Sequence, residues 1–180
     1  YTGTYKGIEV TVTSTGIGAP SAAIAMEEMY EAGMEVAVRM GTVMSMQDDM
    51  LGHFLIPIAA MRREGTSQSY VDLSYPAVAD VELVNVMNET VQQMGKRYLN
   101  GLNCTMDGFY SCMHDSKFSL ECGRDMSKTF EEVKKLGVTG IDMESSCILT
   151  LGRLMGVKTC ILTVVTVLEN LKETLKGQDR

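Results

Sequence analysis

Residues 14–21 read Ser-Thr-Gly-Ile-Gly-Ala-Pro-Ser and decide how this chain folds. They follow a β-rich run at residues 8–13 and lead into the helical pattern of residues 20–32. Glycine lets the backbone approach a ligand closely, and the proline suits the first turn of a helix, where the N–H that it lacks is not needed. A strand, a turn with Gly16 and Gly18, and a helix N-terminus together predict an anion-binding site.

A second apolar run, at residues 36–38, leads to Arg39 and then to Gly41 and Thr42. A guanidinium group is a permanent cation and threonine adds a hydroxyl donor, so this strand suits the recognition of phosphate. The alternative interpretation of Arg39 is a surface ion pair, which contributes only about 0–1 kcal/mol. Because Arg39 follows an apolar run and precedes Gly41 and Thr42, the phosphate role is favoured.

Strand-like and helical segments alternate along the chain, which predicts an α/β fold. Such alternation indicates βαβ units and a mainly parallel or mixed sheet that helices cover on both faces. The length of 180 residues, without a recognisable linker, predicts one domain. Strands are expected at about residues 8–14, 35–40, 54–60, 102–106 and 157–166, and helices at about 20–32, 77–96, 127–136, 143–155 and 168–175.

Composition and charge argue against several classes of function. The formal net charge is −7 and the pI is near 4.9, which argues against non-specific binding to nucleic acid or to anionic membranes. No apolar run approaches about 20 residues and no signal-peptide pattern is present, so a cytoplasmic protein without membrane contact is expected. The 5 cysteines are an odd number without CxxC spacing, which favours reduced thiols over a disulfide framework or a metal site.

These motifs resemble the signature of the nucleoside phosphorylase family, which includes uridine phosphorylases and purine nucleoside phosphorylases. The glycine turn with its Pro-Ser pair matches the first family block. Arg-Met-Gly-Thr at residues 39–42 resembles the family's phosphate strand, and Pro-Ala-Val-Ala-Asp at residues 76–80 resembles the start of a family helix. Asp-Met-Glu-Ser at residues 142–145 is similar to the ribose motif of uridine phosphorylases. The resemblance spans nearly the whole chain and is closest to uridine phosphorylase.

The resemblance implies a three-layer sandwich around a central mixed β-sheet, of the phosphorylase/hydrolase-like class. Residues 1–180 would form a single nucleoside phosphorylase domain that lacks the family's first strand and C-terminal helix. The implied reaction is phosphorolysis, in which inorganic phosphate attacks C1′ of a (deoxy)ribonucleoside and releases the free base, without an organic cofactor. Family members assemble as dimers or as hexamers of dimers, which implies a homodimer or a larger assembly here.

The resemblance also implies roles for individual residues. Arg39 would bind phosphate, Thr42 would bridge phosphate and ribose, and Glu144 would accept hydrogen bonds from the ribose hydroxyls. Phe109 would lie against the base, with a place in the core as the less favoured alternative. Met143 would lie against the sugar or base, although it is equally suited to the core. The substrate-binding set is completed by Gly16, Gly18 and Asp142.

The sequence departs from the family where the nucleobase is recognised. Gln and Arg normally follow the Phe-Tyr pair, but Met113 and Asp115 stand at those positions here. Lys117 or Arg124 could supply a cation from a rearranged loop, and neither histidine of the chain is given a catalytic role. Nucleobase specificity is therefore the weakest part of the resemblance.

Some uridine phosphorylases hold a metal ion at the dimer contact, with ligands from the backbone of the glycine turn and from a serine. Ile17 and Ser21 match those two positions. The acidic residue that completes such a site has no counterpart in this chain, so no metal ligand is assigned.

Three alternatives stay open. Within the enzyme class, the chain could be a purine nucleoside phosphorylase or a nucleosidase that uses water. A non-catalytic family member that assembles with an active partner is suggested by Met113, Asp115 and the unusual Val-Met pair at residues 43–44. A plain Rossmann nucleotide binder is disfavoured, because the third glycine of a GxGxxG motif is missing and Arg39 stands where an acidic residue is needed.

Overall fold

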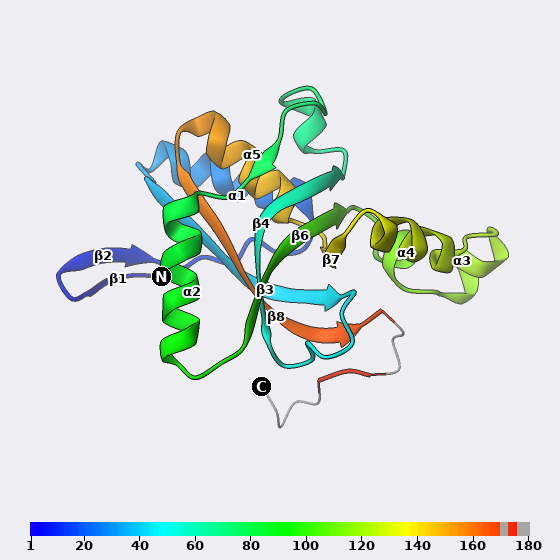
Figure 1. The fold of residues 1–180 in the computed structure, drawn as a ribbon. Coiled ribbons are helices and arrows are strands. Elements are labelled where there is room, and N and C mark those ends of the chain that lie inside the picture. The colour runs from blue at the N-terminus through cyan, green and yellow to red at the C-terminus, as the bar shows by residue number, and fades with distance from the viewer. Residues whose placement is uncertain (170–172, 176–180) are drawn as a thin grey trace.

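A mixed six-stranded β-sheet forms the centre of the protein (Figure 1). The structure is a computed structural model that describes residues 1–169 and 173–175. The strands of the central sheet are β3 (Val36–Ser45), β4 (Phe54–Arg63), β5 (Ala77–Val78), β6 (Tyr98–Met106), β7 (Val138–Asp142) and β8 (Lys158–Leu168). They lie in the order β5-β4-β6-β7-β3-β8.

The central sheet closes on itself, because β4 pairs with β8 as well as with β6. The pairs β3–β8, β4–β6 and β6–β7 are parallel, whereas β3–β7, β4–β5 and β4–β8 are antiparallel. In the closing pair, Leu55 lies opposite Thr163, whose hydroxyl donates a hydrogen bond to the Leu55 carbonyl at 3.0 Å. The strands β4, β6, β7, β3 and β8 therefore form a ring, and the short β5 is attached outside it.

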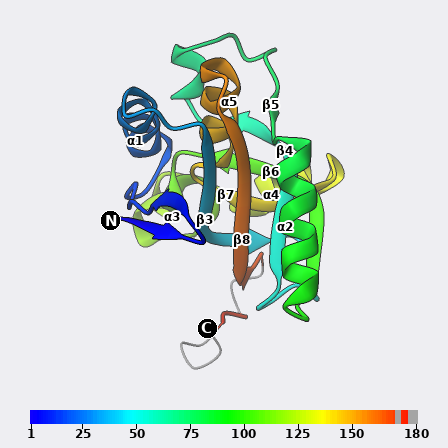
Figure 2. The ribbon, with the colours of Figure 1, turned by 90° about the vertical axis from the view of Figure 1, so that its left-hand side faces the viewer.

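Helices flank the sheet on both sides, as the α/β interpretation predicts (Figure 2). Helix α1 (Ala19–Glu31) packs against α5 (Ser145–Met155) on one side, and α2 (Val81–Gln93) covers the other. The short α3 (Lys117–Glu121) and α4 (Met126–Lys135) follow β6 in the chain, and α4 contacts β7. Two further turns are a 3₁₀-helix, η1 (Ser67–Ser69), and a π-helix, η2 (Phe109–Met113).

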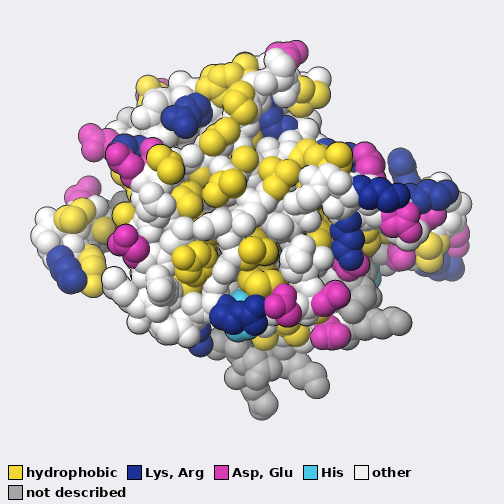
Figure 3. Space-filling view, in the orientation of Figure 1, with side chains coloured by type: hydrophobic (Ala, Val, Ile, Leu, Met, Phe, Trp, Pro, Cys, Tyr) yellow, Lys and Arg dark blue, Asp and Glu magenta, His cyan; other side chains and the backbone are white. Residues whose placement is uncertain are grey.

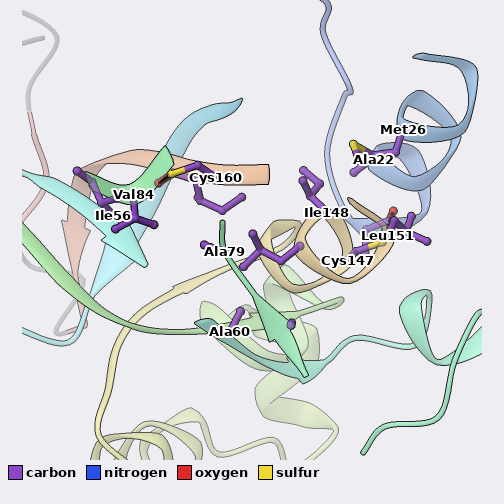
Figure 4. Packing of buried hydrophobic residues seen from close by; sticks show 14 of the residues in the cluster. Ala22, Met26, Ile56, Ala60, Ala79, Val84, Cys147, Ile148, Leu151 and Cys160 are labelled. Carbon is purple, nitrogen blue, oxygen red and sulfur yellow. Dashed lines mark hydrogen bonds between the residues drawn. The ribbon is translucent and has the colours of Figure 1, made fainter. Parts of the chain in front are cut away.

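The contact between α1 and α5 places the glycine turn beside the sheet. Ala22 and Met26 of α1 belong to the same buried cluster as Cys147 and Leu151 of α5 (Figure 4). Small side chains allow this close approach, and the Cys147 thiol reaches the carbonyl of Ala19 at 3.6 Å. The N-termini of both helices therefore lie in one rigid unit.

The structure corrects several boundaries of the predicted elements. The run at residues 8–13 is not a strand of the central sheet; β2 (Ile8–Thr11) pairs only with β1 (Thr2–Tyr5) in an exposed hairpin. The helix predicted at residues 77–96 begins at Val81. Asp80 is its N-cap, and Ala77 and Val78 form β5, which pairs with β4.

Two further corrections concern β7 and the end of the chain. Strand β7 was not predicted at all. The helix predicted at residues 168–175 is wrong where it can be tested, since Leu168 ends β8 and Thr174 bridges to Val167. Residues 170–172 lie outside the described part of the chain.

Candidate active site

An ion pair between Arg39 and Glu144 lies at the centre of the predicted site. Arg39 Nη2 donates to Glu144 Oε2, and the two side chains are only 14% and 9% exposed. The other carboxylate oxygen of Glu144 accepts the backbone N–H of Gly18 at 2.7 Å. Arg39 Nη2 also lies 3.8 Å from Oδ2 of Asp142. The glycine turn, the arginine of β3 and the acidic pair at the end of β7 lie far apart in the sequence but meet in one place.

The glycine turn binds an anion, but that anion belongs to the protein. Gly18 immediately precedes α1, where the unpaired N–H groups of the first turn favour negative charge. Its N–H, which the glycine motif predicted to bind a ligand, is bonded to Glu144 instead. The turn therefore holds the carboxylate in place on one side while Arg39 holds it on the other.

One nitrogen of Arg39 is left without a partner. Within the described residues, Nη1 is buried and makes no hydrogen bond. A buried donor without an acceptor costs free energy, and the guanidinium fork is well suited to an oxyanion. Arg39 therefore presents an unused, positively charged donor directly beside Glu144.

Asp142 is buried next to the ion pair and anchors the start of α5. Thr105 Oγ1 donates to its Oδ1 at 2.9 Å, and the N–H of Ser145 donates to both carboxylate oxygens, at 3.2 and 3.3 Å. The Ser145 hydroxyl bonds to Oδ2 as well. Burial raises the pKa of Asp142, and this effect outweighs the opposite influence of Arg39 and of the Ser145 hydrogen bond. Asp142 thereby fixes the loop that carries Met143 and Glu144.

The remaining predicted residues lie outside this hydrogen-bonded network as far as the described residues show. Thr42 is exposed on β3, Gly16 is exposed in the turn, and Met143 is half-buried. The Phe109 ring is 42% exposed and stacks on His114 with ring centroids 5.6 Å apart. The network therefore contains Arg39 and Glu144, whereas Thr42, predicted to bridge phosphate and ribose, and Phe109, predicted for the base, lie outside it.

The positions that recognise uracil in the family carry no suitable donor here. Met113 is buried in a methionine-rich cluster under α4, and Lys117 is exposed and pairs with Glu121 at 3.9 Å. Arg124 lines a surface hollow of about 320 Å³ together with Tyr110. This hollow does not include the Arg39–Glu144 pair.

Two buried polar residues near the site, Glu64 and Ser146, were not predicted from the sequence. The Ser146 hydroxyl donates to Glu64 Oε1 at 2.9 Å, although the two residues are far apart in the chain. Glu64 gives no local signal, since an acidic residue after a strand is usually an exposed loop residue. The one local sign is the Ser-Ser pair at residues 145–146, which places two hydroxyl groups at the start of α5.

The described residues contain no group of three or more His, Cys, Asp or Glu side chains arranged to hold a metal ion. The hydroxyl of Ser21, which matches an interface metal ligand in some uridine phosphorylases, is bonded to the carbonyl of Thr15.

Charged and hydrophobic side chains gather on different parts of the face seen in Figure 3. Figure 3 shows charged side chains gathered over the α3–α4 end, whereas hydrophobic side chains are spread across the centre of that face. Among the helices of the described residues, none combines the length and apolar character that crossing a bilayer requires.

Comparison with known proteins assigns the chain to a family. The family model of the phosphorylase superfamily matches residues 1–176. A uridine phosphorylase of Thermococcus kodakarensis is 35% identical over 166 residues, and one of Escherichia coli is 32% identical over 163 residues. These alignments cover 91% and 89% of this chain but 60% and 64% of the relatives.

A solved structure of uridine phosphorylase from Vibrio fischeri agrees with these relatives. It superposes with a TM-score of 0.82 at 32% sequence identity, covering 97% of this chain and 66% of that one. The chain therefore spans less than two thirds of the length of the curated relatives named above. The match of the family model over almost the whole chain shows that this protein belongs to the phosphorylase superfamily.

Proposed function

We propose that the protein is a nucleoside phosphorylase of the uridine phosphorylase type, which converts a (deoxy)ribonucleoside and inorganic phosphate into free base and (deoxy)ribose 1-phosphate. The observation that carries this proposal is the buried, unpartnered Nη1 of Arg39 beside the Glu144 carboxylate. One guanidinium would hold the attacking phosphate through Nη1 and orient the ribose-binding carboxylate through Nη2. The uridine phosphorylases of similar sequence support this choice.

The arrangement suits a reaction in which charge develops at C1′. As the glycosidic bond lengthens, positive charge builds on the sugar, and a phosphate oxygen must already lie close to C1′. Arg39 would fix the phosphate, Thr42 would bridge phosphate and ribose, and Glu144 would fix the ribose hydroxyls. Positioning of this kind can lower a barrier by about 7–11 kcal/mol in ideal cases.

Inorganic phosphate is the co-substrate, and the proposal needs no organic cofactor. Phe109 would support the base, since its ring is partly exposed and stacked on His114. Uridine is the preferred substrate on the basis of the Asp-Met-Glu-Ser motif at residues 142–145 and the named relatives.

The proposal includes a homodimer, or a hexamer of dimers, in the cytoplasm. Ile17 of the glycine turn, Ile24 of α1 and Met40 of β3 are large apolar side chains exposed on neighbouring parts of the chain, which a second copy would cover. The 5 cysteines are all free thiols, as expected in a reducing compartment. Light scattering of the purified protein tests the assembly, and a purely monomeric protein would contradict it.

The decisive experiment measures release of free base from uridine, inosine and methylthioadenosine, each with and without phosphate. We expect release from uridine that depends on phosphate. Release without phosphate would identify a nucleosidase, and preference for inosine would identify a purine nucleoside phosphorylase. Binding of ribose 1-phosphate without turnover of any nucleoside would favour a non-catalytic family member.

The role of Arg39 is tested separately by Arg39→Lys. Lysine keeps the charge but cannot engage phosphate and Glu144 with one planar fork. We expect kcat/KM to fall about 10²- to 10³-fold, the usual cost of removing one charge-stabilising donor. Arg63→Lys is the matched control, because Arg63 forms an exposed pair with Glu132 at the end of β4.

A further inference from the structure

Glu64 is a buried carboxylate that the proposed chemistry does not use. It is 2% exposed and follows the last residue of β4. Its Oε2 accepts the N–H of Ser67 at 2.8 Å, and its Oε1 accepts the hydroxyl groups of Ser67 and of Ser146, the latter at 2.9 Å. These partners are all neutral, and they satisfy the hydrogen-bonding capacity of a carboxyl group that is buried away from water.

Ser146 connects Glu64 to the Arg39–Glu144 pair. It is fully buried in the first turn of α5, two residues after Glu144. Its N–H donates to Thr105 Oγ1 at 2.8 Å, and that hydroxyl donates to Asp142 at 2.9 Å. The first turn of α5 is therefore held on one side by Glu64 and on the other by Thr105 and Asp142.

Gly65, the next residue, makes a second connection. Its N–H donates to Asp107 Oδ2 at 2.8 Å. Asp107 lies just after β6 and two residues before Phe109. The dipeptide 64–65 therefore ties the segment that carries the aromatic ring to the helix that carries the ribose carboxylate.

The loop that contains this dipeptide is itself braced. Arg62 Nε donates to Ser67 Oγ at 2.9 Å, and its Nη1 donates to the carbonyls of Asp72 and Tyr75, both at 2.7 Å. Arg62 Nη2 donates to the carbonyl of Val71 at 2.9 Å. Because Arg62 holds this loop through four hydrogen bonds, the loop can couple the position of one strand end to that of another.

We propose that Glu64 is a positioning residue: through Ser146, and through the adjacent Gly65–Asp107 bond, it sets the distance between Glu144 and Phe109. Among the described residues, its hydrogen bonds go to Ser67 and Ser146 and not to the ion pair. Only its kinetic consequence rests on the proposed function, because the mechanical coupling belongs to the fold.

The first test is amide hydrogen exchange on Glu64→Gln. Glutamine has nearly the same volume but presents an amide group to the donors that surround Glu64. We expect faster exchange both at residues 105–110 and at residues 142–148. Ser146→Ala breaks only the connection to α5, so exchange should rise at residues 142–148 alone. Glu132→Gln is the matched control, since it removes an exposed carboxylate paired with Arg63, and it should change neither segment.

The second test is kinetic. In an enzyme active on uridine, Glu64→Gln should lower kcat/KM about 10- to 100-fold, as expected when reacting groups shift by a fraction of an ångström to about 1 Å. Ser146→Ala should lower kcat/KM less, because it breaks only one of the two connections. The double variant should match Glu64→Gln alone, because Ser146 acts through its hydrogen bond to Glu64. Glu132→Gln should retain wild-type kinetics.

Several outcomes would overturn the inference. Exchange that changes only within residues 62–76, or equally in Glu132→Gln, would make Glu64 a local loop residue. Wild-type kcat/KM in Glu64→Gln would also overturn it. If Glu64→Gln does not fold, unchanged exchange at residues 142–148 in Ser146→Ala overturns it, and faster exchange there supports it. A wild-type protein inactive on every nucleoside would refute the proposed function while the exchange results still decide the role of Glu64.

Discussion

The guanidinium group of Arg39 lies over Gly41, two residues further along β3, so closely that a Cβ atom at position 41 would meet it. Residues two apart in a strand point to the same face of the sheet. The glycine therefore gives the arginine side chain the space in which it turns toward Glu144. The spacing of Arg39 and Gly41 in the sequence has a direct steric cause.

Replacing Gly41 with alanine should displace this guanidinium. The added methyl group collides first with Nη1, the nitrogen proposed for phosphate, so we expect kcat/KM for phosphate and uridine to fall by about 10²-fold. Gly3→Ala in the β1–β2 hairpin is the control, because no atom lies within 4 Å of a Cβ there. Steady-state kinetics that are the same for both variants would contradict the steric argument.

Asp80 should contribute measurably to stability as the N-cap of α2. Its Oδ1 accepts the N–H groups of Glu82 and Leu83, both at 3.1 Å. Asp80→Ala should lower the free energy of unfolding by about 1 kcal/mol, whereas Asp80→Asn should retain most of it. Urea denaturation of both variants measures the difference. An alanine variant as stable as wild type would show that the cap is not needed.

Asp142 should make stability depend on pH in an unusual direction. Because burial raises its pKa, its contribution to the folded state is present below the unfolded pKa and is lost as the pH rises through the folded pKa. Asp142→Asn removes this loss, so its stability relative to wild type should increase with pH. Urea denaturation between about pH 4 and about pH 8 follows this difference.

The control for this titration is Asp49→Asn, which should show the opposite sign. Asp49 is exposed, and the hydrogen bond from Arg97 lowers its pKa, so its contribution is present above the unfolded pKa and is lost as the pH falls. The effect should be small, because the pair is open to solvent. Parallel pH profiles for the two variants would rule out the proposed effect of burial on Asp142.

The thiols should divide into reactive and protected groups. Burial raises the pKa of Cys104 and of Cys147 to about 12, and that of Cys160 to about 11, so these thiols stay protonated near pH 8. Cys122 is exposed. Iodoacetamide should therefore label Cys122 in the native protein and all 5 cysteines after denaturation, as mass spectrometry would show. Native labelling of Cys104 would contradict the burial.

The sequence predicted the local features of the site better than the contacts between residues that lie far apart in the chain. The glycine turn, the proline and the apolar run of residues 20–32 predicted α1 almost to the residue, because each reports a local backbone preference. The meeting of Arg39 and Glu144, 105 residues apart, was predicted through the resemblance to a family and not from hydrophobic periodicity. Periodicity carries no information about such distant partners.

The missed elements have physical explanations. Strand β7 is short and contains Gly140, which weakens any β signal, yet Leu55, Asn103 and Val43 crowd that position so closely that only glycine fits. Residues 8–11 do form a strand, but alternation along one strand does not reveal which strand pairs with it. The buried role of Glu64 depends on Ser146, a partner that no local pattern indicates.

The closure of the sheet between β4 and β8 has a consequence for how the protein reaches its native state. A closed ring of strands has no free edge. A shift of one strand by a single residue would change its pairing with both neighbours, so all pairs must reach their register together. The β3–β8 pair joins residues 36–45 to residues 158–168, near opposite ends of the sequence. Ring formation therefore requires segments that lie far apart in the chain to come together, and folding should be slow and cooperative.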